Sequence, residues 1–183
     1  MKKYMIGAIA LSLLAGACLN VPQLAAQTET PKPTKTAAQN CFAKLKTLAG
    51  DWTHKDDKSG KETVTLRYRV ISGGMAVEEE MLPGTPYSMT SIYTLDNGNL
   101  VMTHFCSMGN QPHLKATAAS TPSRMEFECI GGGGNMKSEN DYHIHHLLFT
   151  FLSDNHFTQE WAANKDGKQE GAADTYDSYR KAP

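Results

Sequence analysis

From Asp51 onward, apolar and polar residues alternate with a period of two, which is typical of β-strands with one buried face. In Thr63–Ile71, for example, Val64, Leu66, Tyr68 and Val70 alternate with polar side chains. Turn-forming residues interrupt this pattern at intervals of roughly 8–12 residues. The pattern predicts a strand that starts at Trp52 and further strands at Thr63–Ile71, Met75–Met81, Ser88–Leu95, Leu100–Met108, His113–Ala118, Arg124–Ile130, Tyr142–Leu152, His156–Ala163 and Tyr176–Arg180.

Several connections between these segments have the residues of tight turns. Asp96-Asn97-Gly98-Asn99 predicts a hairpin because Asn-Gly readily takes positive φ, and Lys165-Asp166-Gly167-Lys168 predicts a second tight turn. The run Gly131–Gly134 lacks the helix and lysine that should follow a phosphate-binding loop. We therefore expect a flexible loop there, able to act as a lid at a barrel mouth.

A helical period is present in only one segment, Ala37–Leu48, where Phe42, Leu45 and Leu48 recur and Gly50 ends the pattern. About ten antiparallel strands with short turns would leave open edges in a flat sheet, and closure removes those edges. We therefore predict an all-β fold, an up-and-down antiparallel barrel of about ten strands with one short N-terminal helix. A two-sheet sandwich is the alternative.

The N-terminus has the pattern of an export signal. Lys2 and Lys3 precede an apolar stretch, Met5–Ala17, that is too short to span a bilayer as a helix. Residues 1–26 are predicted to be a signal peptide cleaved before Gln27. Alternatively, Ala15–Cys18 resembles a bacterial lipobox, in which Cys18 would carry a lipid, although Ala15 stands where Leu is usual.

The predicted domain organisation follows from this cleavage. Residues 27–36 are expected to be a flexible tether, and residues 37–183 the barrel domain. The chain should be secreted or periplasmic, with membrane contact only through the signal peptide or a lipid anchor at Cys18.

Charge and cysteine content narrow the partners and the chemistry. The formal net charge is −1, and −3 after cleavage, which argues against nucleic acid as a partner. Cleavage also leaves Cys41, Cys106 and Cys129. Two interpretations stay open: a Cys106–Cys129 disulfide with one spare thiol, or three thiols.

Gly50-Asp51-Trp52, after the helix and at the start of the first strand, resembles the Gly-x-Trp signature of the calycin superfamily, which includes lipocalins, fatty-acid-binding proteins and nitrobindin-like barrels. The resemblance implies that Trp52 packs across the closed end of the barrel beneath an Arg near the C-terminus, here Arg180. The stretches Thr103–Cys106, Gly109–Pro112 and Asp154–His156 are also similar to an uncharacterised bacterial family of secreted calycin-like barrels, which implies no activity.

Histidines provide the main candidate chemistry. His143 and His145 should share an inward face with Leu147 and Phe149, and His104 is the candidate third ligand of a zinc site. Cys106, if it is a free thiol, or His156 is a further candidate. The alternative is that these histidines are structural or orient a ligand.

The likeness to nitrobindin-like barrels implies a second cofactor, a haem whose iron a late histidine would ligate. His145 and His156 are the positions that match this role.

Two residues are candidates for catalysis. Glu79 should share a face with Val77 and Met81, and a carboxylate in an apolar lumen could act as a general base. Cys106 could assist it. The alternative for Glu79 is a solvated charged strand or a pairing with a cation.

The leading functional prediction is a barrel that binds a small, largely apolar molecule in its lumen. The predicted ligand-binding residues are Tyr68, Met89, Tyr93, Met102, His104, Phe127, His143, His145 and Phe149. The alternatives are a metal- or haem-dependent enzyme that uses the His cluster, and an envelope protein with a packed barrel and a protein partner.

Overall fold

The computed structural model describes residues 34–56 and 58–182. These residues form one α-helix, a short 3-10 turn and eleven strands. Their bounds are α1 (Ala37–Lys46), β1 (Gly50–Lys55), β2 (Glu62–Ile71), η1 (Ser72–Gly74), β3 (Ala76–Met81), β4 (Met89–Asp96), β5 (Asn99–Phe105), β6 (Asn110–Ala116), β7 (Arg124–Gly134), β8 (His143–Ser153), β9 (His156–Lys165), β10 (Lys168–Gln169) and β11 (Asp174–Arg180). The predicted signal peptide, Cys18 and residues 27–33 lie outside the described residues.

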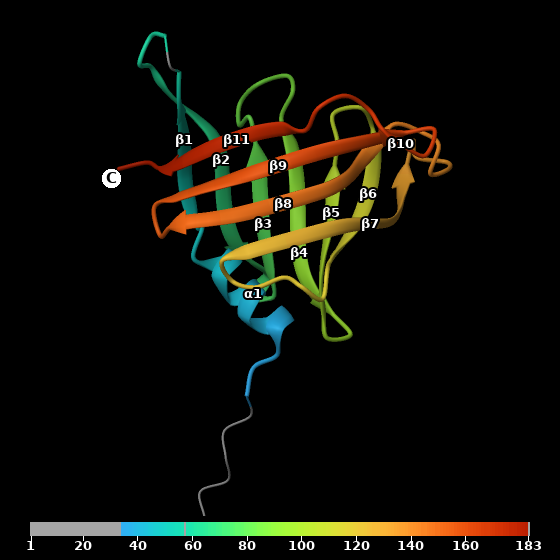
Figure 1. The fold of residues 1–183 in the computed structure, drawn as a ribbon. Helices are drawn as coiled ribbons and strands as arrows, with labels where there is room; N and C mark the ends of the chain where they lie inside the picture. The colour runs from blue at the N-terminus through green and yellow to red at the C-terminus, as the bar shows by residue number, and fades with distance from the viewer. Residues whose placement is uncertain (1–33, 57, 183) are drawn as a thin grey trace, which may run out of the picture. The chain divides into compact units, whose positions relative to one another are not determined.

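Ten of the strands close into an antiparallel barrel (Figure 1). Strands β1 to β9 pair in chain order, β9 pairs with β11, and β11 returns to β1 through Trp52↔Arg180 and Thr53↔Tyr179. The short strand β10 pairs only with β9 and stands outside the barrel. The predicted all-β antiparallel barrel with one short helix is confirmed, and the two-sheet sandwich is wrong.

The predicted tight turns have the backbone that their residues favour. Asn97 and Gly98 both have positive φ, 45° and 81°, and so do Asp166 and Gly167, at 51° and 72°. Positive φ at both central positions gives the type I′ turn, whose twist matches that of the flanking strands. These turns set the register of the β4–β5 and β9–β10 hairpins.

The helix covers one end of the barrel, at the bottom of Figure 1. A capping box starts it: the Thr36 hydroxyl accepts from the Gln39 backbone N–H, and the Gln39 side chain accepts from the Thr36 N–H. Cys41, Phe42 and Leu45 of this helix are buried in the core. The loop between β3 and β4 lies at the opposite end, which we call the mouth (Figure 1).

The run Gly131–Gly134 corrects a prediction. It is the last part of strand β7, paired with Asn110–His113 of β6, and not a flexible loop or lid. A Cβ at Gly134 would lie 2.5 Å from the Gly109 carbonyl oxygen, and one at Gly132 would lie 2.9 Å from that of Gln111. Glycine is required at these positions because the neighbouring backbone approaches too closely for a side chain.

The structure decides between the two interpretations of the cysteines, a Cys106–Cys129 disulfide or three thiols. Cys41, Cys106 and Cys129 are all free thiols, as in the alternative without a disulfide. Cys106 follows β5 and Cys129 lies on β7, so strand β6 separates them. The Cys106–Cys129 pairing is therefore not present in this structure.

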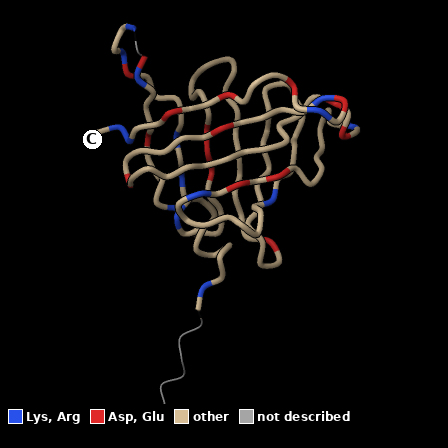
Figure 2. The backbone as a smooth tube through the Cα atoms, in the orientation of Figure 1, with Lys and Arg blue, Asp and Glu red and all other residues tan. Residues whose placement is uncertain are grey.

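The outer surface carries mixed charge. Lys and Arg are scattered among Asp and Glu over strands and turns, without a continuous basic band in the view of Figure 2. Among the described residues, no helix combines the length and the apolar character needed to cross a membrane.

Candidate functional site

A buried polar network lies inside the barrel around Glu79. Its carboxylate accepts a hydrogen bond from the Tyr93 hydroxyl at 2.5 Å and one from Gln159 Nε2 at 2.8 Å, and Gln159 Nε2 also donates to the Tyr68 hydroxyl at 3.2 Å. All four side chains are almost fully buried. Burial raises the pKa of Glu79, and the hydrogen bonds from Tyr93, Gln159 and Tyr68 oppose that rise only in part.

His104 lies in the same layer of the barrel, two strands away. The register Glu79↔Ser91↔His104 runs across β3, β4 and β5. The Ser91 hydroxyl is 2.9 Å from His104 Nδ1, and the imidazole lies against the Trp161 ring with the centroids 5.0 Å apart. Burial lowers the pKa of His104 to about 4, so the ring is neutral at neutral pH.

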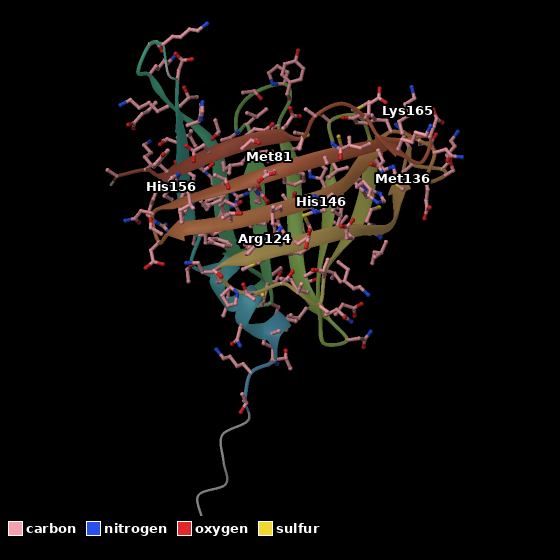
Figure 3. All side chains as sticks on the ribbon, viewed as in Figure 1. Met81, Arg124, Met136, His146, His156 and Lys165 are labelled. Carbon is pink, nitrogen blue, oxygen red and sulfur yellow. The ribbon has the colours of Figure 1, made fainter. Side chains whose placement is uncertain are left out.

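One pleat closer to the mouth, a row of sulfur-containing side chains follows the same strands. Met81 of β3 pairs with Met89 of β4, and the Cys106 Sγ lies 4.0 Å from the Met89 Sδ. These side chains, with His104 beneath them, form one wall of a cavity at the mouth, where Figure 3 labels Met81. His104 thus lies at the floor of a sulfur-rich pocket, and Glu79 and Ser91 belong to the same layer of the barrel without lining the pocket.

This mouth cavity has a volume of about 180 Å³. Its lining is mostly apolar and aromatic, with few polar groups: Met81, Met89, His104, Cys106, Ser107, Met108, Tyr142, Ile144, Trp161, Asp174 and Tyr176. A larger hollow of about 420 Å³ lies beside the start of α1, but neither a histidine nor a carboxylate lines it. The mouth cavity combines apolar walls with an imidazole, a thiol and a carboxylate, from His104, Cys106 and Asp174.

Trp161 leaves one hydrogen bond unmade in the wall of this cavity. Its Nε1 is buried and has no acceptor among the described residues. The other tryptophan, Trp52, donates from Nε1 to the Leu48 carbonyl oxygen at 2.7 Å. A buried donor without a partner costs about 1–3 kcal/mol, so an acceptor that reached this N–H would be stabilised.

The structure divides the predicted ligand-binding residues into three groups, of which His143 and His145 are the last. Met89 and His104 line the mouth cavity. Aromatic and apolar side chains that were expected to line an open lumen instead fill the barrel centre as its packed core: Tyr68, Tyr93, Met102, Phe127 and Phe149. Their rings pack edge to face, for example Tyr93 on Phe127 at 5.8 Å, so the expected space for a ligand along the whole lumen is absent at these residues.

His143 and His145 lie outside the cavity because strand β8 contains a bulge. The pairing of β8 with β9 shifts register between Ile144 and His146, which breaks the period-two alternation at His145. Ile144, and neither histidine, therefore lines the cavity. The expectation that both histidines share the inward face of Leu147 and Phe149 is wrong for this reason.

The predicted metal ligands do not meet as expected. His143 and His145 come together, but the third donor beside them is Cys129 of β7, with all three ligand atoms within 4.8 Å of one another. His104 is not part of this group and contacts Ser91 and Trp161 instead. Burial raises the pKa of the Cys129 thiol.

The remaining histidines of interest make outer-surface contacts. His146 Nε2 lies 3.1 Å from a Glu126 carboxylate oxygen, and Figure 3 labels His146 on β8. His156 Nε2 lies 2.6 Å from Asp177 Oδ1, and its ring stacks on Tyr179. Neither His145 nor His156, the two haem-ligand candidates, lines the mouth cavity.

The two candidate catalytic residues, Cys106 and Glu79, lie at different depths in the half of the barrel near the mouth. Cys106 is in the cavity wall and is accessible from it, whereas Glu79 is fully buried in the network beneath. The arrangement can bind a small molecule against Cys106 and His104, but Glu79 is enclosed by Tyr68, Tyr93 and Gln159.

Two important residues were missed in the sequence. Trp161 and Gln159 follow the inward alternation of β9 that starts at Phe157, so the periodicity alone could have placed them inside. Cys129 could not have been found as a partner of His143, because their proximity depends on the bulge in β8.

Comparison with known proteins does not assign this chain to a family. The chain matches no protein-family model and no curated protein sequence. The closed antiparallel barrel with one short helix is consistent with a calycin-like barrel.

Proposed function

We propose that this protein is a secreted or periplasmic barrel that binds one compact, largely apolar molecule in the mouth cavity. The observation that carries the proposal is the apolar cavity of about 180 Å³ whose lining includes Trp161, an indole whose N–H has no acceptor among the described residues. Three thioethers and a thiol line it, from Met81, Met89, Met108 and Cys106, and they give an apolar ligand a soft and adaptable surface.

The size of the cavity limits the ligand. Pockets for drug-sized molecules measure about 300–1,000 Å³, whereas a closed apolar cavity of about 150 Å³ takes benzene. The mouth cavity therefore fits one aromatic ring or a short branched chain, and a haem would need a larger space. The ligand should also carry a hydrogen-bond acceptor for the Trp161 Nε1.

Binding can be tested with two single-ring probes of nearly equal size, acetophenone and ethylbenzene, of which only acetophenone has a carbonyl acceptor. The chain has two tryptophans, so ¹⁵N NMR should show two indole N–H signals, which Trp161→Phe assigns. We expect acetophenone to move the Trp161 signal and leave the Trp52 signal in place. It should bind roughly fivefold tighter than ethylbenzene, since one hydrogen bond contributes about 1 kcal/mol.

A variant whose new side chain fills the cavity provides a second test of binding. Cys106→Phe should abolish binding of both probes, whereas Val70→Phe, at an exposed position of β2, adds a phenyl ring outside the cavity and should leave binding unchanged. Failure of both probes to bind the wild-type protein would overturn the proposal and favour an envelope protein with a packed barrel and a protein partner.

Export is tested separately. Cell fractionation and mass spectrometry of the mature chain should find the protein outside the cytoplasm with Gln27 at its N-terminus. A chain that begins at a lipid-modified Cys18 would indicate the lipoprotein alternative, and an intact N-terminus in the cytoplasm would overturn this part of the proposal.

A further inference from the structure

A second group of potential ligands lies away from the mouth cavity, where strands β7 and β8 part. Their last paired residues are Glu128 and His146. Beyond this pair, Cys129 of β7 and His143 and His145 of β8 lie with one ligand atom each within 4.8 Å of the others. His143 is buried, and Cys129 and His145 are partly exposed.

The two imidazoles have the spacing of ligands to one ion. His143 Nε2 lies 3.2 Å from His145 Nδ1. Zinc–nitrogen bonds of 2.0–2.1 Å in a tetrahedral site place two nitrogen ligands roughly 3.4 Å apart. The separation of the two nitrogens is therefore close to that of two ligands of one zinc ion.

The outer nitrogen of the His143 ring has an acceptor of the kind that orients metal ligands, and the outer nitrogen of the His145 ring has a carboxylate nearby, beyond hydrogen-bond distance. His143 Nδ1 lies 2.7 Å from the Asp141 carbonyl oxygen, so it carries the proton and leaves the Nε2 lone pair directed at His145. His145 Nε2 lies 3.9 Å from a Glu128 carboxylate oxygen. A backbone carbonyl and a carboxylate are the usual second partners of metal-binding histidines.

The donor set selects the type of metal. One thiol and two imidazoles suit zinc and other borderline-soft cations, whereas calcium and magnesium need oxygen ligands. Cys129 is a free thiol whose Sγ makes only a weak contact with the Gly131 carbonyl oxygen, at 3.3 Å. The neighbouring group of Glu126, Glu128 and His146 differs, because Arg124 already pairs with Glu126 at 3.4 Å.

We propose that Cys129, His143 and His145 bind one Zn²⁺ ion, with solvent at the fourth position. On binding, the Cys129 thiol releases its proton to solvent and the sulfur binds the metal as a thiolate. The proton that His145 Nδ1 donates to His143 Nε2 moves to His145 Nε2, on the side of Glu128, which leaves Nδ1 free to bind the ion. The His145 side chain retains 39 % of its exposure, which gives the ion a route into the site. Three protein ligands and one open position are the arrangement of zinc sites that can activate water.

The test is a titration of the reduced, metal-free protein with ZnCl₂ in a calorimeter. We expect one ion per chain, and a loss of affinity of at least tenfold for each of Cys129→Ser, His143→Gln and His145→Gln. The matched control is His146→Gln, which alters the adjacent histidine of the same strand and should leave the affinity unchanged. Circular dichroism of each variant checks that the barrel is folded.

Cobalt provides a readout of coordination that does not depend on affinity. Co²⁺ added to the wild-type protein should produce a thiolate-to-metal charge-transfer band that is absent in Cys129→Ser. Absence of this band in the wild-type protein, or equal zinc affinity in Cys129→Ser and wild type, would overturn the proposal. Binding of acetophenone in the mouth cavity is independent of both results.

Discussion

The guanidinium of Arg180, on the last strand, stacks on the indole of Trp52, on the first, with its central carbon 4.4 Å from the ring centroid. The same guanidinium donates hydrogen bonds to the carbonyl oxygens of Thr47 and Ala49, which follow helix α1. The pairing of β1 with β11 closes the barrel. The Arg180 side chain thus connects this strand pair with the segment that follows helix α1. This is the contact that the likeness to calycins implies.

Removal of the Arg180 guanidinium should destabilise the barrel. We expect Arg180→Met, which keeps an unbranched side chain, to lower the free energy of unfolding by about 1–3 kcal/mol. The variant loses the cation–π contact and the hydrogen bonds to the carbonyl oxygens of Thr47, Ala49 and Asp154 and to the Asn155 side chain. Urea denaturation measures this change. Arg180→Lys should recover only part of it, since an ammonium group cannot both stack and reach two carbonyls, and full recovery by Lys would contradict the stacking argument.

His104 should make the protein less stable as the pH falls. Its pKa is about 4 in the folded protein, against 6.5 for an unperturbed histidine, so as the pH falls the unfolded chain binds a proton before the folded protein does. The stability it contributes is complete above pH 6.5 and is lost as the pH falls toward 4, by about 3 kcal/mol in all. Urea denaturation between pH 7 and 4 should show this loss relative to His104→Gln. Parallel curves for the two proteins would contradict it.

Glu79 should make the protein less stable as the pH rises, the opposite of the effect of His104. Burial raises its pKa in the folded protein above the ordinary value of 4.5, so the folded state keeps its proton at a pH where the unfolded chain releases it. The contribution of Glu79 is present below pH 4.5 and is lost as the pH rises through the folded pKa. Glu79→Gln cannot ionise, so its stability relative to wild type should increase from pH 4.5 toward 7. A constant difference over this range would show that the carboxyl ionises normally.

The two tryptophans should respond differently to replacement by phenylalanine. Trp52→Phe removes the hydrogen bond to the Leu48 carbonyl oxygen, whereas Trp161→Phe removes a buried donor that has no acceptor among the described residues. We therefore expect Trp52→Phe to cost about 1–3 kcal/mol more than Trp161→Phe in thermal or urea unfolding. Equal losses would indicate that the Trp161 Nε1 has a partner.

Two adjacent glycines provide a matched test of the β6–β7 pairing. Gly134→Ala places a methyl group against the Gly109 carbonyl oxygen at a residue with φ of +64°, whereas the closest neighbour of a Cβ at Gly133 is a side-chain atom of Gln111 at 3.8 Å. We expect Gly134→Ala to destabilise the protein by about 1–3 kcal/mol and Gly133→Ala to change it little. Thermal unfolding of the two variants measures the difference, and equal effects would argue for the flexible loop that the sequence suggested.

The sequence by itself determined the barrel. The period-two alternation, the Asn97-Gly98 and Asp166-Gly167 turns and the capped helix are local features, and each local preference agrees with the final fold. The strand positions could be predicted because alternation depends only on neighbouring residues.

Only the tertiary structure decided which residues form the candidate sites. The bulge at His145 changes the face of every earlier residue in β8, so Ile144 enters the cavity and Cys129 replaces His104 beside the histidine pair. The volume of the lumen likewise depends on how Tyr93, Phe127 and Phe149 pack across the barrel, which a linear pattern does not contain. Sequence periodicity tells which side chains point inward, but their packing and strand register determine what space and which neighbours they share.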